Sequence, residues 1–493
     1  MLKNVRRRYG LSAVVAFLLL FFVLAWWGRS DRLAPDSTGS PSLSRHAPVR
    51  KVSPILPPPQ GRAPPTIAAL SPGALADGPP QQAPPSVECR AARARDSAAG
   101  ARLAAMSPAQ REAFIEESAR SGVAEETDAM RAADACEGAN DTEALGCLLA
   151  NGFSRARDVL ALYRDEQAKQ RAFLRQAERV ATRGDARSLL AAAHILPFAE
   201  VSAWSRDDSL ERRPAALEWI VRAQQLGRDD PVVQWGVATY REFGGEPTER
   251  MRIARAASVR RLLALDPGNA AVHLLALGMA PETRTPLDAK AFMRLAALPH
   301  YRTRVPEIAA VMLDAFRDMP PDPAFRSAAL LIDPEHVTAT QCAADADIML
   351  SAQLLTAITV VTDGLPNVPQ ASCTKEAIAS TEELRDECLR FFARLHASSR
   401  TVSERNIAAA IARRAAASDA EKAHWQEVYK RQRWQTEQAG HASGRLNPYV
   451  QARAIAAGWR SGDELLGIET LLRAARIPLE PPREWKIPGE PPD

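Results

Sequence analysis

Between residues 185 and 334, apolar positions recur with the spacing of amphipathic helices, and polar stretches separate them. The pattern predicts helices in pairs: 185–195 with 213–226, 232–243 with 248–265, 270–277 with 286–297, and 304–316 with 324–332. Each helix is short and carries one apolar face, so it must stack on a neighbour to be stable. We therefore expect an all-α body built as an α-solenoid over residues 185–334.

Prolines divide this stretch at nearly regular intervals. They stand in Asp-Pro or Leu-Pro pairs, and by subtraction they lie 36, 32 and 35 residues apart: Pro231, Pro267, Pro299 and Pro334. Helix-turn-helix repeats have a similar period of roughly 34 residues. Proline lacks an amide donor and disfavours helix in the residue before it. Each pair is therefore expected to end one helix and precede the next.

Two helix endings resemble the second helix of the tetratricopeptide repeat. They are the segments 261–267 (Arg-Leu-Leu-Ala-Leu-Asp-Pro) and 329–334 (Ala-Leu-Leu-Ile-Asp-Pro). The chain departs from the family pattern elsewhere, because Arg255 stands where a small residue is expected and Gly278 is displaced by one position. The chain therefore resembles a tetratricopeptide-like helical repeat protein with degenerate repeats, and the function of such a family is unknown.

The tetratricopeptide resemblance implies a concave surface that receives a peptide or the tail of a partner protein. The first helices would line this groove, which makes Trp235, Tyr240 and His273 the candidate partner-binding residues. An alternative stays open for each of them. An aromatic ring on an alanine-rich helix often fills the core, and a single histidine is often an ordinary surface or core residue.

Helical patterns continue on both sides of the repeats. We divide the folded part into an N-terminal helical region at 88–184, the tetratricopeptide-like repeats at 185–334 and a C-terminal helical region at 335–477. Expected helices outside the repeats include 165–181, 349–361, 403–417, 419–438 and 462–473. The proline-bearing tail at 478–493 should run extended along the surface or be disordered.

The N-terminus predicts a membrane anchor. Residues 1–10 form a basic stub, and residues 11–27 are uncharged and apolar and end in Trp26 and Trp27. This length is at the short end of the ~17–25 residues that span a bilayer, and paired tryptophans suit its interface. A cleaved signal peptide is the alternative, but no small-x-small cleavage site follows. The positive charges predict a single-pass protein of the bacterial inner membrane, with a cytoplasmic N-terminus and a periplasmic folded region.

Residues 28–87 have the composition of a tether. They are rich in proline, serine, glycine and alanine, with repeated Pro-Pro pairs, and cannot bury enough apolar surface to fold. We expect a disordered, semi-extended segment. At ~3 Å per residue it could hold the folded part up to roughly 150 Å from the membrane.

The composition is that of a folded helical protein and argues against nucleic-acid binding. Apolar residues make up 46% of the chain, which is ample for a core, and helix-favouring alanine, leucine, arginine and glutamate dominate. The 63 basic and 59 acidic residues nearly balance, and no dense basic run lies beyond the first ten residues. Nucleic acid is therefore not expected as a partner.

Six cysteines suit three disulfides in an exported protein. Of the 15 possible pairings, we expect Cys136 with Cys147 across a short turn and Cys373 with Cys388. Cys89 and Cys342 remain as a third pair. Zinc is the alternative for the first pair, but no histidine or second cysteine pair stands nearby.

The sequence shows no catalytic, metal or cofactor motif. It lacks a Gly-x-Ser-x-Gly elbow, a Walker loop and a His-Glu-x-x-His helix. Glu117-Ser118 is similar to the catalytic pair of lytic transglycosylases, but the glycine-rich segment that follows it in that family is missing. We expect no cofactor, and any small-molecule ligand stays unidentified.

The sequence thus predicts a membrane-anchored periplasmic scaffold whose helical repeats bind another protein of the cell envelope. The alternative is an enzyme, or an enzyme subunit, that acts on an envelope component through a site built from residues distant in sequence.

Overall fold

The computed structural model describes residues 132–133, 135–136, 140–153, 156–200, 214–240, 248–277, 289–326, 342–363, 369–443 and 446–487. Helices form in all the longer ranges, and no strand occurs in any of them. The all-α prediction is confirmed for this part of the chain. The predicted anchor, tether and Glu117-Ser118 lie outside it. No helix within these ranges is both long enough and apolar enough to cross a membrane.

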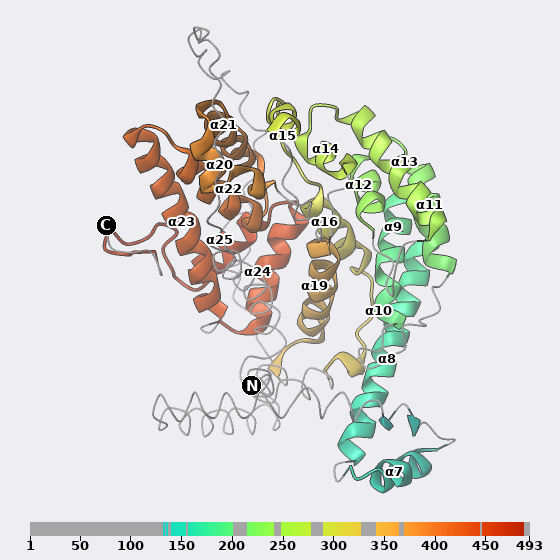
Figure 1. Ribbon diagram of the computed structural model, residues 1–493. Helices are drawn as coiled ribbons and strands as arrows, with labels where there is room; N and C mark the ends of the chain where they lie inside the picture. The colour runs from blue at the N-terminus through green and yellow to red at the C-terminus, as the bar shows by residue number, and fades with distance from the viewer. Residues whose placement is uncertain are drawn as a thin grey trace.

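The N-terminal half of the described chain, the arm, runs from α7 to α15 (Figure 1). Its helices are α7 (Asp141–Ala150), α8 (Ala156–Ala181), α9 (Ala186–Ile195), α10 (Pro197–Glu200), α11 (Pro214–Leu226), α12 (Pro231–Thr239), α13 (Glu249–Leu265), α14 (Ala270–Ala276) and α15 (Ala289–Ala296). Along it, α9 packs on α8 and α11, and α13 packs on α12 and α14. The helices expected from 185 to 297 are therefore present, within a few residues of their predicted ends.

Local capping explains where these helices begin. The Asp185 carboxylate accepts a hydrogen bond from the Ser188 amide at 2.9 Å, and Asp230 accepts one from Val232 at 2.9 Å. Pro231 occupies the first helical position of α12, where its missing amide donor costs nothing. The Asp-Pro pair at 230 thus acts as predicted. Asp266 is the C-cap of α13, and α14 starts after the Asn269 cap.

The second half of the described chain begins in the middle of the molecule. It comprises α16 (Val305–Ala315), α19 (Asp345–Asp363), η1 (Gln370–Cys373), α20 (Lys375–Ser380), α21 (Glu382–Ser398), α22 (Val402–Ala415), α23 (Asp419–Ser443), α24 (Pro448–Arg460) and α25 (Glu464–Ala474). Figure 1 shows α16, α19 and α24 between the arm and the group α20 to α23. α24 was not among the helices predicted from the sequence.

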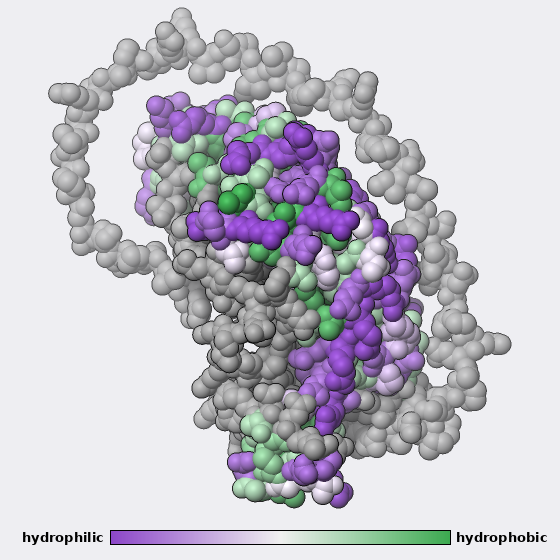
Figure 2. Space-filling model, turned by 90° about the vertical axis from the view of Figure 1, so that its right-hand side faces the viewer, coloured by the Kyte–Doolittle hydropathy of each residue, from purple (hydrophilic) through white to green (hydrophobic). Residues whose placement is uncertain are grey.

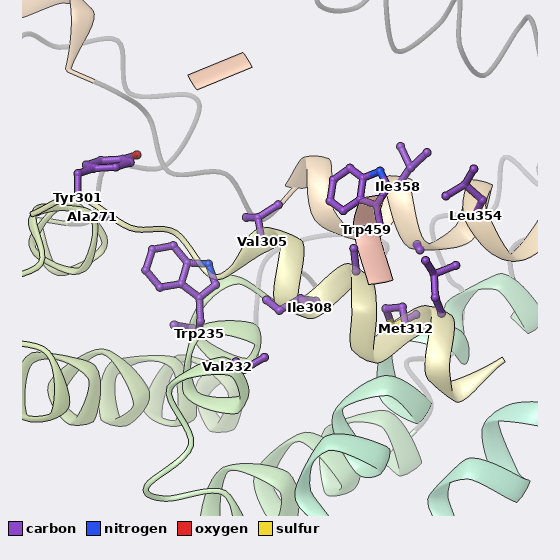
Figure 3. Close-up of a cluster of buried hydrophobic side chains, with 14 of the residues drawn as sticks. Val232, Trp235, Ala271, Tyr301, Val305, Ile308, Met312, Leu354, Ile358 and Trp459 are labelled. Atoms are coloured by element: carbon purple, nitrogen blue, oxygen red, sulfur yellow. The ribbon is translucent and has the colours of Figure 1, made fainter. Parts of the chain in front are cut away.

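One continuous core joins the two halves. α16 packs against α9 and α12 of the arm and against α19 and α24 of the second half. Trp235 of α12, Ile308 and Met312 of α16, Ile358 of α19 and Trp459 of α24 belong to the same buried cluster (Figure 3). Consequently, α16 covers part of the side of the arm that faces the second half, which we call the inner side.

Disulfides form where the sequence predicted them. Cys136 bonds Cys147, and Cys373 bonds Cys388. The second bond ties η1 to α21. Cys342 is also disulfide-bonded, while its predicted partner Cys89 lies outside the described residues.

The Cys136–Cys147 bond lies in a lobe of its own. Leu148 of α7 and Leu160 and Tyr163 of α8 form a small buried cluster around it, distinct from the main core. Figure 1 places α7 at the far end of α8, away from the other helices.

Candidate functional site

Residues 299–304 form an extended strap between α15 and α16, and a cluster of buried polar groups that includes Asn269, Thr303 and Glu404 lies around it. In an extended backbone, successive side chains point to opposite sides. Tyr301 and Thr303 contact α22 of the second half, whereas the side chains of His300 and Arg304 pair with Asp266 of the arm. Arg302 reaches the arm through its backbone amide, which donates to Asn269. The strap therefore contacts both halves through alternate residues.

On one side of the strap, Glu404 of α22 is 2% exposed. Its carboxylate accepts hydrogen bonds from the hydroxyls of Ser399 at 2.7 Å, Thr401 at 2.8 Å, Tyr301 at 3.1 Å and Thr303 at 3.4 Å. Burial raises the pKa of Glu404, and the hydroxyl donors act against that rise. Burial and the Glu404 charge also raise the pKa of Tyr301.

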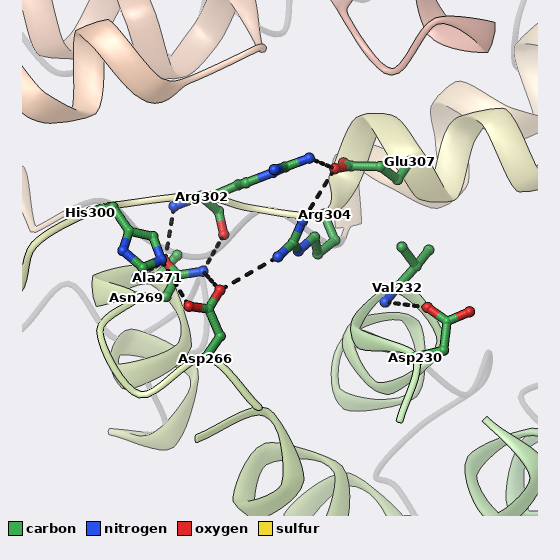
Figure 4. Close-up of polar contacts among 9 residues, drawn as sticks. All are labelled: Asp230, Val232, Asp266, Asn269, Ala271, His300, Arg302, Arg304 and Glu307. Atoms are coloured by element: carbon green, nitrogen blue, oxygen red, sulfur yellow. Dashed lines mark hydrogen bonds and ion pairs between the residues drawn. The ribbon is translucent and has the colours of Figure 1, made fainter. Parts of the chain in front are cut away.

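On the other side, the strap lies against the loop between α13 and α14 (Figure 4). Asp266 accepts hydrogen bonds from Asn269 at 3.0 Å and pairs with His300 at 2.8 Å and Arg304 at 3.4 Å. Asn269 also donates to the Arg302 carbonyl at 2.8 Å and accepts from the Arg302 amide at 2.9 Å. Glu307 then pairs with Arg302 at 2.5 Å.

A second carboxylate lies at the same end of α22. Glu464, the first residue of α25, accepts a hydrogen bond from the Val402 amide at 2.9 Å. Burial raises the pKa of Glu464 to about 7, against the hydrogen bond, and the nearby Glu404 charge adds to the rise. The N-terminus of α22 favours both acids through the helix dipole, and Glu464 also accepts the Val402 amide.

This cluster has the chemistry of a structural joint. Glu404 is enclosed, and four hydroxyls from two segments, the strap and the loop before α22, occupy its acceptor sites. No group of metal-ligating side chains occurs in the part of the chain described here.

Two predicted groove residues are in the core. Trp235 is 0% exposed and Tyr240 is 3% exposed, so the prediction that they face a partner is wrong, and the core alternative holds. The Tyr240 hydroxyl donates to the Ala193 carbonyl at 3.4 Å, and its ring lies 5.0 Å from that of His194. They are buried because α9 and α13 pack on α12 from one side and α16 from another.

The His273 side chain on α14 is bonded to the loop that precedes this helix. Its Nε2 lies 2.8 Å from the Pro267 carbonyl oxygen. The imidazole thus connects α14 to the turn that precedes it. The structure does not bring His273 together with Trp235 and Tyr240 as one surface.

The outer face of α13 is the strongest candidate for an interaction surface. Met251, Ala254, Ser258 and Leu262 are buried. The opposite face exposes Ile253, which is 59% exposed, with Ala256, Ala264, Arg252 and Arg260 around it. On this side of the molecule, hydrophobic side chains lie among strongly hydrophilic ones (Figure 2).

This face is also basic. Arg250, Arg252 and Arg260 are exposed on α13, which contains only one acid, Glu249. Arg252 pairs with Glu249, and Arg261 pairs with Asp229 of the neighbouring loop. The arginine excess could have been counted from the sequence, but the exposure of Ile253 could not.

Comparisons with protein-family models, with curated proteins and with solved structures find no match to this chain.

Proposed function

We propose that the protein is a membrane-anchored periplasmic scaffold that binds another envelope protein on the outer face of α13. The observation that carries this proposal is the exposed Ile253 on a helix face that also exposes Ala256, Arg260 and Ala264, with Arg252 beside it. Contiguous apolar surface rimmed by polar residues is typical of protein-binding sites.

The chemistry of the face indicates the class of partner. An amphipathic helix can bury its apolar side against Ile253 and the alanines, while acidic residues along its edges meet the arginines. Arginine binds carboxylates through two parallel hydrogen bonds, which adds geometric selectivity. We therefore expect an acidic amphipathic helix on the partner.

The remaining parts of the proposal come from the sequence. Residues 11–27 would anchor the chain, residues 28–87 would act as the tether, and the arm would be a tetratricopeptide-like solenoid. In this arrangement the arm binds its partner through its outer surface, because α16 packs against α9 and α12 on the inner side.

In-cell photo-crosslinking tests the proposed surface. A benzoylphenylalanine at Ile253 should give a specific protein adduct, and one at Leu466, which is 36% exposed on α25, should not. Reversing two charges, Arg252→Glu with Arg260→Glu, should reduce the Ile253 adduct at least tenfold, since close charge pairs contribute ~1.5–7 kcal/mol in some interfaces.

Two outcomes would overturn the proposal. One is an Ile253 adduct that survives the charge reversal unchanged, and the other is the same adduct at Leu466. Either result would show that the crosslink reports non-specific contact rather than binding to a basic docking face.

A further inference from the structure

The C-terminal tail, residues 478–487, lies along α23. Side chains of that helix donate to its backbone carbonyls: Trp434 Nε1 to Pro478 at 2.8 Å, Gln435 Nε2 to Leu479 at 3.1 Å and Lys430 Nζ to Arg483 at 3.3 Å. Up to residue 487 the tail therefore lies along the surface, as the first of its two predicted courses has it, although bends at 479–480 and a turn at 483–484 interrupt its extended backbone.

Side chains anchor the tail at a few points. The Trp485 ring lies 5.4 Å from the Trp434 ring, edge to face. Ile487 is buried beside Tyr429 and Ala409, and Glu480 pairs with Arg431 at 2.7 Å. Between these anchors the tail is open to solvent, with Pro478, Pro482, Arg483 and Glu484 all exposed.

This contact has the chemistry of proline-rich peptide recognition. A proline-rich segment presents carbonyl acceptors but few amide donors, and it loses little conformational entropy on binding. Receptors for such segments combine aromatic rings with side-chain donors to the carbonyls. α23 supplies both kinds of group through Trp434, Tyr429 and Gln435.

The tail sequence has a counterpart near the other end of the chain. Residues 478–482 read Pro-Leu-Glu-Pro-Pro, and residues 54–58 read Pro-Ile-Leu-Pro-Pro. Both have the pattern proline, aliphatic residue, any residue, proline, proline. In the tail, the first two of these residues are the ones whose carbonyls bind Trp434 and Gln435.

We propose that the tail-binding surface of α23 is a receptor for proline-rich peptides, that residues 54–58 of this chain are its second ligand, and that the tail competes with them. Trp434 and Gln435 would bind the carbonyls of Pro54 and Ile55 as they bind those of Pro478 and Leu479. Occupation by residues 54–58 would fasten the N-terminal segment to the second half of the molecule.

The tail should occupy the α23 surface more strongly than residues 54–58 do. Residues 54–58 have Leu56 where the tail has Glu480, so they lack the ion pair with Arg431. That pair is exposed to solvent and therefore contributes little. The larger advantage comes from Trp485, Ile487 and covalent attachment a few residues from α25, which gives the tail a high effective concentration.

Fluorescence anisotropy with a labelled peptide of residues 51–62 tests the inference. The full chain is used with Pro57→Ala and Pro58→Ala, which removes its internal copy of the ligand. Adding Trp485→Ala and Ile487→Ala, to release the tail, should tighten binding of the peptide at least tenfold. In this released chain, Trp434→Phe keeps an aromatic ring but lacks the Nε1 donor, and binding should weaken at least fivefold.

Competition and folding are checked in the same chain. An unlabelled peptide of residues 477–487 should displace the labelled one, and a 51–62 peptide with Pro57→Ala and Pro58→Ala should not bind. Hydrogen exchange of α23 verifies that the released chain is folded; should it not be, Glu480→Lys replaces the double substitution and should tighten binding at least twofold. No gain on release, or no displacement by the tail peptide, would overturn the inference, and neither result bears on α13.

Discussion

Glu464, one of the two carboxylates near the N-terminus of α22, makes folding stability depend on pH, whereas Glu404 is held by hydroxyl groups. Glu404 is paired with hydroxyls, whereas Glu464 receives a single backbone amide within hydrogen-bonding distance. Burial, opposed by that amide, raises the pKa of Glu464 to about 7 from 4.5. The folded state therefore binds this proton more tightly than the unfolded state between those two pH values, and stability falls as pH rises through that window.

Replacing Glu464 by glutamine should remove this pH dependence. Glutamine keeps an acceptor for the Val402 amide but carries no charge. We expect Glu464→Gln to raise the free energy of unfolding at pH 8 by up to about 3 kcal/mol, and to change it little at pH 4, where the carboxylic acid is already neutral. Urea unfolding at both pH values measures this. An unchanged slope between pH 4 and pH 8 would contradict it.

At the scale of elements, α24 and α25 are held together by a pair of glycines. A Cβ atom on Gly458 would lie 2.5 Å from the Gly467 Cα and 2.8 Å from the Asp463 carbonyl oxygen. Both are backbone atoms, which cannot move aside without moving a helix. The two helices can approach this closely only because these positions lack side chains.

Gly458→Ala should therefore force α24 and α25 apart. We expect a loss of about 3 kcal/mol in the free energy of unfolding, since overpacking typically costs 1–3 kcal/mol and here the clash is with backbone. Gly146→Ala in α7 is the matched control, because nothing lies within 4 Å of its Cβ position. Alanine should stabilise that helix by roughly 0.5–1 kcal/mol. Equal effects at the two sites in thermal unfolding would refute the packing argument.

At the scale of the whole molecule, the described chain has one large core and one separate lobe. The main cluster includes Trp235 of the arm and Phe391 of α21, joined through α16 and the strap. The α7 lobe has its own small cluster around the Cys136–Cys147 bond and contacts the rest along α8. The two regions should therefore lose protection from hydrogen exchange at different urea concentrations.

Hydrogen exchange in increasing urea should show α12 and α22 losing protection together, because both bury side chains in the same cluster. The α7 lobe should lose protection at lower urea. Reducing the disulfides should lower the lobe's opening free energy by ~2–4 kcal/mol, the usual contribution of such a bond. Protection of α12 that is lost well before that of α22 would show that the strap does not couple the halves.

The sequence by itself determined features that depend on a few neighbouring residues. Asp230 and Pro231 set the start of α12, and the spacing of Cys136 and Cys147 and of Cys373 and Cys388 indicated two disulfides. Caps, prolines and short loops act within a turn or two of helix, so they can be read without knowing the fold.

Tertiary structure alone decided which faces meet and which remain exposed. Trp235 has the same local sequence whether it lines a groove or a core, and α16, about 70 residues later, helps to bury it. The hydrogen bond from Tyr301 to Glu404 joins residues 103 positions apart. No local rule connects such residues, because their contact depends on how every intervening helix packs. The same packing leaves Ile253 exposed and places the tail against Trp434.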